Sequence, residues 1–319
     1  HDRFARRLIV GLAGRNIRKA LEIFLEFCNS GYISEEHIFK IRQSEGQYVL
    51  PFHLVATVLL RMNRRFYDGD HSFVKNIFDA KNADEKPSYF CRYLILIWLK
   101  QRFKTKGDAR IEGYYKKITV KDSLVGYGLS SDIIDREINY LLRAHCIIAE
   151  HLKIDECSDE DLIRIGPAGI VHLDLIDNVN YLAALSEDTY FSDRFTAEEI
   201  LHKINKGLGS HLHLKTTISN AENFINFIED QKKDLLSICG SYINNEKLLN
   251  MLNFAESRKA IDRVKMSNSH DPWFDADKKL IRGSKHQVIA INKYDYGILV
   301  EFKEGVMGLV KKADMGGVS

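Results

Sequence analysis

Three cations crowd the start of a predicted helix near the N-terminus. Arg15, Arg18 and Lys19 fall in the first turn of a helix whose apolar stripe is formed by Ile17, Leu21, Phe24, Leu25 and Cys28. The helix dipole is positive at that end, so cations there cost a few tenths to about 1 kcal/mol. A phosphate or another anion bound at this turn would offset the cost. The alternative is that the arginines are surface residues of an ordinary amphipathic helix.

The same stretch resembles a nucleotide-sensing motif. Residues 14–21 read GRNIRKAL, which is similar to the G-N-x-R-x-A-L signature of the lid subdomain in AAA+ and STAND-type P-loop ATPases. In that family an arginine at the position of Arg18 senses the γ-phosphate, so the resemblance implies nucleotide sensing by Arg18 with Arg15 beside it. The match departs at Arg15, where the family usually has a small residue. A helix expected over residues 51–61 and the segment HSFVKNIFDA follow in the order seen in STAND ATPases.

The catalytic elements of such an ATPase are not in this sequence. There is no G-x-x-x-x-G-K-[ST] loop to hold phosphates, and no apolar strand ends in Asp-Asp or Asp-Glu to hold magnesium. We therefore predict no catalytic residue and no cofactor in this chain, and we expect any ATP and Mg²⁺ to act through an N-terminal half before His1. No metal site is predicted either, because His211 and His213 have no acid or cysteine partner nearby.

A basic stretch with aromatic residues lies in the middle of the chain. Residues 100–121 contain eight lysines or arginines against two acids, with Phe103, Tyr114 and Tyr115 between them. Cations with aromatic rings suit phosphate and base contacts, so this stretch is a candidate nucleic-acid contact. The alternative is a solvated connector whose lysines keep it soluble.

Residues 118–176 resemble a winged helix-turn-helix over their whole length. A short helix at 120–125 is followed by glycines at 126 and 128, a second helix capped by Ser130 or Ser131, extended runs at 146–151 and 162–166, and a further helix after Pro167. The second helix is expected to expose Asp132, Asp135, Arg136, Asn139, Tyr140 and Arg143. The loop at 155–161 carries five acids and no base, and DNA repels such a loop. We therefore expect this unit to bind a protein or to act as a spacer.

Residues 283–312 predict three short strands with glycines at the bends. Asp295-Tyr296-Gly297, Val300-Glu301 and the run from Gly305 to Val310 closely resemble the S-one-type OB fold. That resemblance implies RNA or single-stranded DNA binding, with Tyr296 at the stacking position. Leu299 replaces the second aromatic residue and Lys311 replaces the usual histidine, while Lys312, Lys285 and Lys293 add positive charge. The departure leaves a protein-docking role open, and three strands are fewer than the five of a complete barrel.

The predicted architecture is multi-domain and mainly α. It comprises a helical lid at 1–80, a winged helix at 81–176, a helical spacer at 177–275 and a partial OB-fold β-barrel at 276–319. In the spacer, Thr196 and Glu199 suggest a capping box, residues 221–243 a long helix, and the polar residues around His211 and His213 a loop. The longest apolar run, residues 93–99, is too short to cross a bilayer. Five scattered cysteines without a CxxC pair favour reduced thiols and a cytoplasmic protein.

Three hypotheses follow for function. The first is a regulatory and interaction arm of a STAND or AAA+-like ATPase that couples nucleotide state to nucleic-acid or partner binding, in bacterial defence or signalling. The second is a non-enzymatic protein that binds RNA or single-stranded DNA. The third is a scaffold, in which the basic residues 100–121 and the acidic residues 155–161 attract each other between subunits. Oligomeric state is left open.

Overall fold

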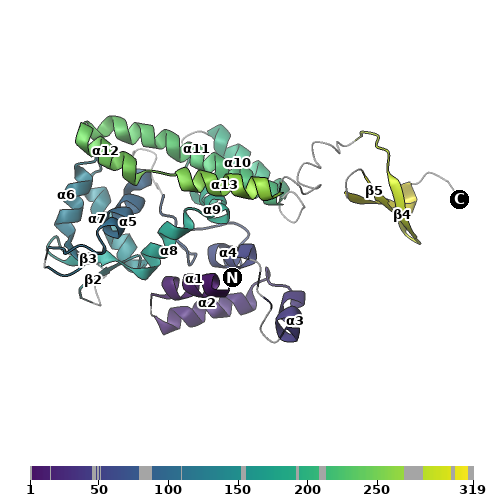
Figure 1. The fold of residues 1–319 in the computed structure, drawn as a ribbon, viewed down its shortest axis with the longest axis horizontal. Helices are drawn as coiled ribbons and strands as arrows, with labels where there is room; N and C mark the ends of the chain where they lie inside the picture. Colours follow the sequence, from purple (N-terminus) through teal and green to yellow (C-terminus); the bar gives the residue numbers. More distant parts are fainter. Residues whose placement is uncertain are drawn as a thin grey trace.

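The chain is mainly helical and contains two small antiparallel sheets, each with three strands (Figure 1). The computed structural model describes residues 2–14, 16–44, 48, 50, 52–78, 88–108, 110–151, 156–191, 194–207, 213–268, 283–302 and 306–314. No helix among these residues is both long enough and apolar enough to cross a bilayer.

The elements of the first half include four N-terminal helices and the first sheet. In chain order they are α1 (Asp2–Ala13), α2 (Ile17–Asn29), α3 (Glu35–Gln43), α4 (Phe52–Arg61), η1 (Ser88–Phe90), α5 (Cys91–Gln101), β1 (Tyr115–Lys116), α6 (Lys117–Val125), α7 (Ser131–Arg143), β2 (Ile147–Ala149), β3 (Leu162–Ile165) and α8 (Pro167–Leu175). The remaining elements are α9 (Val179–Asp188), α10 (Arg194–Gly207), α11 (His213–Cys239), α12 (Tyr242–Met251), α13 (Ala255–Asn268), β4 (Ile289–Tyr294), β5 (Gly297–Glu301), β6 (Met307–Lys311) and η2 (Lys312–Asp314).

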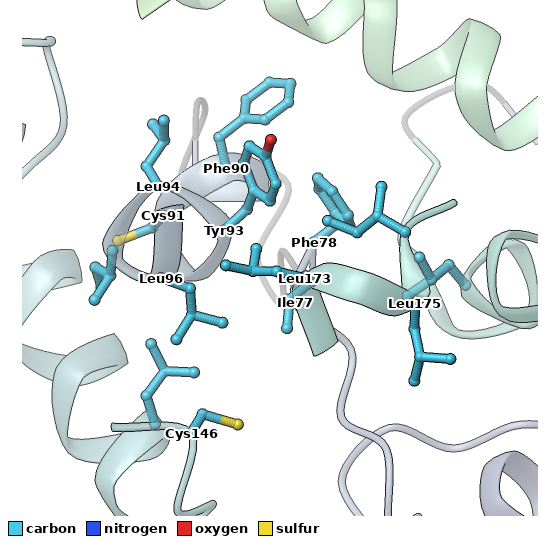
Figure 2. Close-up of a cluster of buried hydrophobic side chains, with 14 of the residues drawn as sticks. Ile77, Phe78, Phe90, Cys91, Tyr93, Leu94, Leu96, Cys146, Leu173 and Leu175 are labelled. Carbon is cyan, nitrogen blue, oxygen red and sulfur yellow. The ribbon is translucent and has the colours of Figure 1, made fainter. Parts of the chain in front are cut away.

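Helix α5 lies at the centre of the core, as its sequence CRYLILIWLKQ predicts for a mostly buried helix. Phe78 stacks on Tyr93 with ring centroids 5.2 Å apart, and Figure 2 shows both residues with Phe90 around this helix. Phe78 also meets Phe90, Phe224 and Phe254 edge-on. The Tyr93 hydroxyl also donates to the Met251 carbonyl oxygen at 2.7 Å. One apolar core therefore runs through the predicted lid, winged-helix and spacer segments.

Helix α2 packs on its neighbours through a different face from its most apolar stripe. Ile23 is buried, and Ala20 and Phe27 pack against the same core. By contrast Ile17, Leu21, Phe24 and Leu25 are each more than half exposed. These four residues form an apolar stripe on the side of α2 next to its buried face. No other described part of the chain covers this stripe. Residues 62–78, which were expected to be helical, instead form turns.

The segment predicted to be a winged helix has the expected helix, turn, helix and hairpin. Ser130 precedes α7 and Gly128 adopts a positive φ of 91° in the turn before it. Strand β3 pairs antiparallel with β2 on one side and with the short strand β1 on the other, in the order β1-β3-β2. The two-residue strand β1 was not predicted, because two residues carry no readable alternation.

The spacer is helical, with two boundaries that differ from the prediction. Helix α10 begins at Arg194, so Thr196 lies inside it and does not cap it. Helix α11 begins at His213, so that residue starts a helix and is not in a loop, while His211 lies outside the described residues. In the first case the capping-box pair lies only two residues inside the helix, within the range by which helix ends commonly shift.

The C-terminal sheet has the order β4-β5-β6 and is not closed into a barrel. Figure 1 shows it beyond the helices, and the intervening residues 269–282 are not among those described. Strand β4 pairs with β5 through a bulge between Ala290 and Asn292, and β5 pairs with β6 in continuous register from Gly297–Lys311 to Glu301–Met307. The predicted turn at residues 303–305 lies outside the described residues.

Candidate nucleic-acid interface

The register of the C-terminal sheet places two of the predicted binding residues, Leu299 and Lys311, on one face. Tyr294, Gly297 and Lys311 form one row across the three strands, and Asn292, Leu299 and Leu309 form the next. Side chains alternate between faces along a strand, and residues paired across strands share a face. Leu299 and Lys311 therefore point to the same side of the sheet, which we call the tyrosine face.

Two tyrosines stack at the end of this face. The rings of Tyr294 and Tyr296 have centroids 5.2 Å apart and are nearly parallel, with an angle of 8° between their planes. Tyr296 is 62% exposed and Tyr294 is 38% exposed. Tyr296 was predicted as the stacking residue, but Tyr294 was not. The sequence does place Tyr294 at the end of a predicted strand, directly before the Asp-Tyr-Gly turn, and that position could have indicated a second ring beside Tyr296.

A glycine and two lysines adjoin the tyrosine pair. A Cβ on Gly297 would lie 2.4 Å from the Val310 carbonyl oxygen, so only glycine allows β6 to approach this closely. The Lys312 amide donates to the Tyr296 carbonyl oxygen at 3.0 Å, which holds the end of β6 beside the tyrosine turn. Lys311 and Lys312 are exposed, and within the described residues neither ammonium forms an ion pair.

The other two predicted lysines are placed differently. Lys293 pairs with Ile298, which alternates with Leu299, so Lys293 lies on the opposite face of the sheet. That face also carries Val300, which is buried, and Phe302, which covers Gly308. Lys285 lies before β4, outside the paired strands. The structure therefore places Leu299 and Lys311 on the face where Tyr296 stacks on Tyr294, holds the Lys312 backbone beside Tyr296, and leaves Lys293 on the opposite face.

Helix α7, the second helix of the segment that resembles a winged helix, holds several of its polar side chains against the rest of the molecule. The Asp135 carboxylate faces the ammonium groups of Lys117 and Lys121 at 2.8 and 2.5 Å. Asn139 accepts a hydrogen bond from the Cys157 amide, and the Arg92 guanidinium lies 3.6 Å from the centre of the Tyr140 ring. The expectation that Asp135, Asn139 and Tyr140 stand exposed was wrong, because these residues face the preceding helices and the hairpin.

Several cations of the basic segment are paired with acids in the same way. Lys116 faces Glu160 at 2.5 Å, and Lys117, which is buried, faces Asp159 as well as Asp135. Arg102 lies over the Trp98 ring. Asp159 and Glu160 of the hairpin loop thus pair with lysines of the basic segment within one chain, and the pairing between subunits that the scaffold hypothesis supposes stays a prediction.

The predicted nucleotide-sensing residues lie at the start of α2. Asn16 caps this helix by accepting from the Lys19 amide at 3.2 Å, and Arg18 is exposed in the first turn. Arg15 lies outside the described residues. No acid occupies the first turn of α2 to balance these cations.

The buried ionisable groups are held by hydrogen bonds. Arg92 and Glu137 form a buried ion pair at 2.5 Å. His172 is buried, accepts from the Lys75 amide at Nε2 (2.7 Å), and so donates from Nδ1 to the Ala168 carbonyl oxygen (2.7 Å). Burial lowers the pKa of His172 to about 4. Burial also raises the pKa of the Cys146 thiol, 3.7 Å from His172, to about 12. Neither group is poised to act as a base or a nucleophile at neutral pH.

Neither of two surface depressions in the described chain brings together a nucleophile and a base, which a catalytic site requires. One is lined by Lys100, Phe103, Lys104 and apolar residues of β3 and α8, and the other by Glu35, Glu36, Arg42 and apolar residues of α3. In the described part of the chain, no group of three or more histidines, cysteines or acids is placed to hold a metal ion. No protein-family model matches this chain, and neither does any curated protein or solved structure with which it was compared.

Proposed function

We propose that this chain is the regulatory and interaction arm of a STAND or AAA+-like ATPase, and that the tyrosine face of its C-terminal sheet binds single-stranded RNA or DNA. The observation that carries the nucleic-acid part is the nearly parallel stack of Tyr294 and Tyr296 beside Lys311 and Lys312. An exposed ring offers a base a stacking surface, and adjacent lysines attract the phosphates. Because every base has a flat face, such binding tolerates many sequences.

The arrangement of the sheet supports an S-one-type OB fold. The polar and aromatic residues of the tyrosine face lie opposite the face that carries Val300 and Phe302. In an OB fold the second of these faces would turn inward and the first would carry the ligand. Leu299 on β5 would then form part of the binding surface, at the position where the family has a second aromatic residue.

The N-terminal helices support the arm role. Arg18 is exposed and free to reach an anion, and the apolar stripe of α2 is uncovered in this chain. A nucleotide-binding half that docked on this stripe would bury it and bring its γ-phosphate near Arg18. The winged-helix unit, several of whose charges are paired internally, would serve as a protein-docking or spacer unit and not as a reader of DNA grooves.

Fluorescence anisotropy with a labelled single strand tests the nucleic-acid proposal. We expect Tyr296→Ala to weaken binding about 5- to 150-fold, which corresponds to the ~1–3 kcal/mol that a stacked base contributes. Tyr294→Ala should weaken it less, because its ring is more covered. Tyr190→Ala, an exposed tyrosine of the helical part, is the matched control and should leave affinity unchanged. Equal affinity for the wild type and Tyr296→Ala would exclude this face as the binding surface.

A separate measurement tests the ATPase part. In a protein that also contains the nucleotide-binding half, Arg18→Ala should weaken ATP binding or slow turnover. Glu22→Ala, one turn further along α2, is the control. Unchanged ATP affinity and turnover in Arg18→Ala would remove the sensing role and leave the nucleic-acid proposal intact.

A further inference from the structure

A shallow depression lies at the C-terminal end of α5, where the chain leaving this helix meets β3 and α8. It has a volume of about 300 Å³ and is lined by Lys100, Gln101, Phe103, Lys104, Ile165 and Ile170. The three apolar residues pack in or against the core, and the three polar residues are exposed. An apolar surface surrounded by exposed polar side chains is typical of a site that another molecule covers.

Arg164 on β3 adds a guanidinium group beside this depression. Its Cζ atom lies 4.8 Å from the centre of the Tyr114 ring and 5.9 Å from the centre of the Phe103 ring, which lines the depression. Among the residues that the structure describes, Arg164 has no carboxylate partner and its side chain forms no hydrogen bond. The two rings hold the guanidinium in place, and its N–H groups keep their capacity to bind a carboxylate.

The loop that carries Tyr114 is fixed against the end of α5. Gly113 has a positive φ of 76°, and a Cβ at this position would lie 2.6 Å from the Phe103 carbonyl oxygen. The Gly113 amide also donates to the Thr105 carbonyl oxygen at 2.8 Å. The rings beside Arg164 are therefore in position before any ligand arrives, which lowers the entropic cost of binding.

The charges around the depression are predominantly positive. Lys104 is exposed and, within the described residues, has neither an ion pair nor a side-chain hydrogen bond. The Lys100 ammonium lies 3.3 Å from the Asp174 carboxylate, but this carboxylate also pairs with Arg7 at 2.5 Å. One acid is thus shared by two cations, while Lys104 and Arg164 have none. An anionic partner would complement this charge.

The apolar lining distinguishes between kinds of anionic partner. Ile165 and Ile170 offer aliphatic surface, which suits a large apolar side chain of a peptide. A nucleic-acid base would need an open ring to stack on, whereas Phe103 and Tyr114 are half-buried and face Arg164. The volume is also at the lower end of the range of about 300–1,000 Å³ that is typical of small-molecule sites. One side chain of a larger partner fits the depression better than a separate small molecule.

We propose that this depression binds an acidic peptide segment of a partner protein. The segment inserts one large apolar side chain between α5, β3 and α8, and its carboxylates lie on Lys104 and Arg164. The inference rests on the protein-docking role proposed above for the winged-helix unit and names the chemistry of the partner. It requires neither the tyrosine face nor Arg18.

An array of short synthetic peptides tests this chemistry on the chain as it is. The probes carry leucine, phenylalanine or serine at the centre, between flanks of aspartate, serine or lysine. We expect the chain to bind the peptides that combine aspartate flanks with a leucine or phenylalanine centre. A serine centre should weaken binding about tenfold or more, because burial of the apolar side chain is lost. No binding, or binding that ignores either the flanks or the centre, would overturn the proposal.

Charge reversal tests the position of the site, by fluorescence anisotropy with the leucine peptide that has aspartate flanks. Lys104→Glu should weaken binding about tenfold or more, because the carboxylates of the peptide then meet a like charge. Arg164→Met, which keeps an unbranched side chain against the rings, should also weaken it. Lys293→Glu makes the same charge change on the C-terminal sheet and is the matched control. Equal affinity of the wild type and Lys104→Glu, or an equal loss in Lys293→Glu, would overturn the assignment.

Photocrosslinking locates the central side chain without any variant of the protein. A peptide with benzoylphenylalanine at its centre and aspartate flanks should attach to residues 100–104 or 163–170, as read by peptide mass spectrometry. Attachment only to other segments would place the peptide elsewhere and overturn the proposal.

Two further outcomes would assign the depression to another occupant and overturn the peptide proposal. One is a labelled single strand that displaces the peptide and loses affinity in Lys104→Glu, and the other is a dimer of the chain that Lys104→Glu dissociates, as measured by sedimentation. Tyr296→Ala should bind the peptide normally, and Lys104→Glu should bind single strands normally. Failure at this depression is therefore distinct from failure at the tyrosine face.

Discussion

Two lysine-rich regions of this chain have similar compositions and different uses. In residues 100–121, Lys116, Lys117 and Lys121 all face carboxylates of α7 or the hairpin loop. In the C-terminal sheet, Lys311 and Lys312 lie beside exposed rings without an ion-pair partner among the described residues. The first region carries more lysines and arginines, yet Lys116, Lys117 and Lys121 are held by acids of the same chain. Availability for a ligand depends on where the acids lie in space, which a charge count does not contain.

The largest expected effect is at the most buried internal cation. Arg92→Met removes the partner of Glu137 and leaves a buried carboxylate with only Arg136 at its edge. We expect a loss of about 3–5 kcal/mol in the free energy of unfolding, measured by urea denaturation. Lys311→Met should change that free energy by less than about 0.5 kcal/mol.

The double variant Arg92→Met, Glu137→Met sharpens this test. Replacing both charges by apolar groups removes the orphaned carboxylate, so much of the lost stability should return. If the stability lost in the double variant equals the sum of the losses in the two single variants, the loss comes from packing and not from the unpaired charge.

An intermediate effect is expected from pH. His172 has a folded-state pKa of about 4 because burial disfavours its charged form, whereas an unfolded histidine titrates near 6.5. The unfolded chain therefore binds more protons between these values. The stabilisation is fully present above pH 6.5 and is lost as pH falls toward 4, on the order of 3 kcal/mol in all. Denaturation midpoints across this range measure it, and His172→Gln should lose less stability than the wild type over the same interval. Parallel curves would contradict this origin.

The smallest effect compares one lysine from each region. Lys311→Gln should lower single-strand affinity a few-fold and reduce the slope of log affinity against log salt by about 0.7, the value for one phosphate contact on a single strand. Lys116→Gln should leave both quantities unchanged, because its charge is already paired with Glu160. Anisotropy titrations at several salt concentrations measure both variants, and a similar slope change in each would erase the distinction between the regions.

Local sequence patterns predicted the helices and strands better than they predicted which elements pack against each other. The helix expected after Ser130 or Ser131 is α7, and its apolar residues Ile133, Ile134, Ile138 and Leu141 are all buried. The alternation after residue 288 predicted three strands, and the sheet has them in that order. Periodicity reports which residues are apolar, but it does not report whether this chain supplies a covering surface, so the uncovered stripe of α2 was not foreseen.

Only part of the candidate site was predicted, because a local pattern does not show which residues meet in the folded chain. Leu299 and Lys311 share a face, as the family pattern implied, but the stack of Tyr294 on Tyr296 depends on how the intervening turn closes. Pairs such as Lys117 with Asp159 and Arg92 with Glu137 join residues that lie far apart in the sequence. Such contacts follow from tertiary packing and leave no signature in a local window of sequence.

The cysteines differ in accessibility, and this has a practical use. Cys28 on α2 is exposed, whereas Cys91, Cys146, Cys157 and Cys239 are buried. Burial raises the pKa of the Cys146 thiol to about 12 and that of Cys157 to about 11, so these two stay protonated and unreactive at neutral pH. A maleimide dye should therefore attach to the native protein at one position without any mutation. Because that position lies on the uncovered stripe of α2, the dye would report directly on anything that comes to cover it.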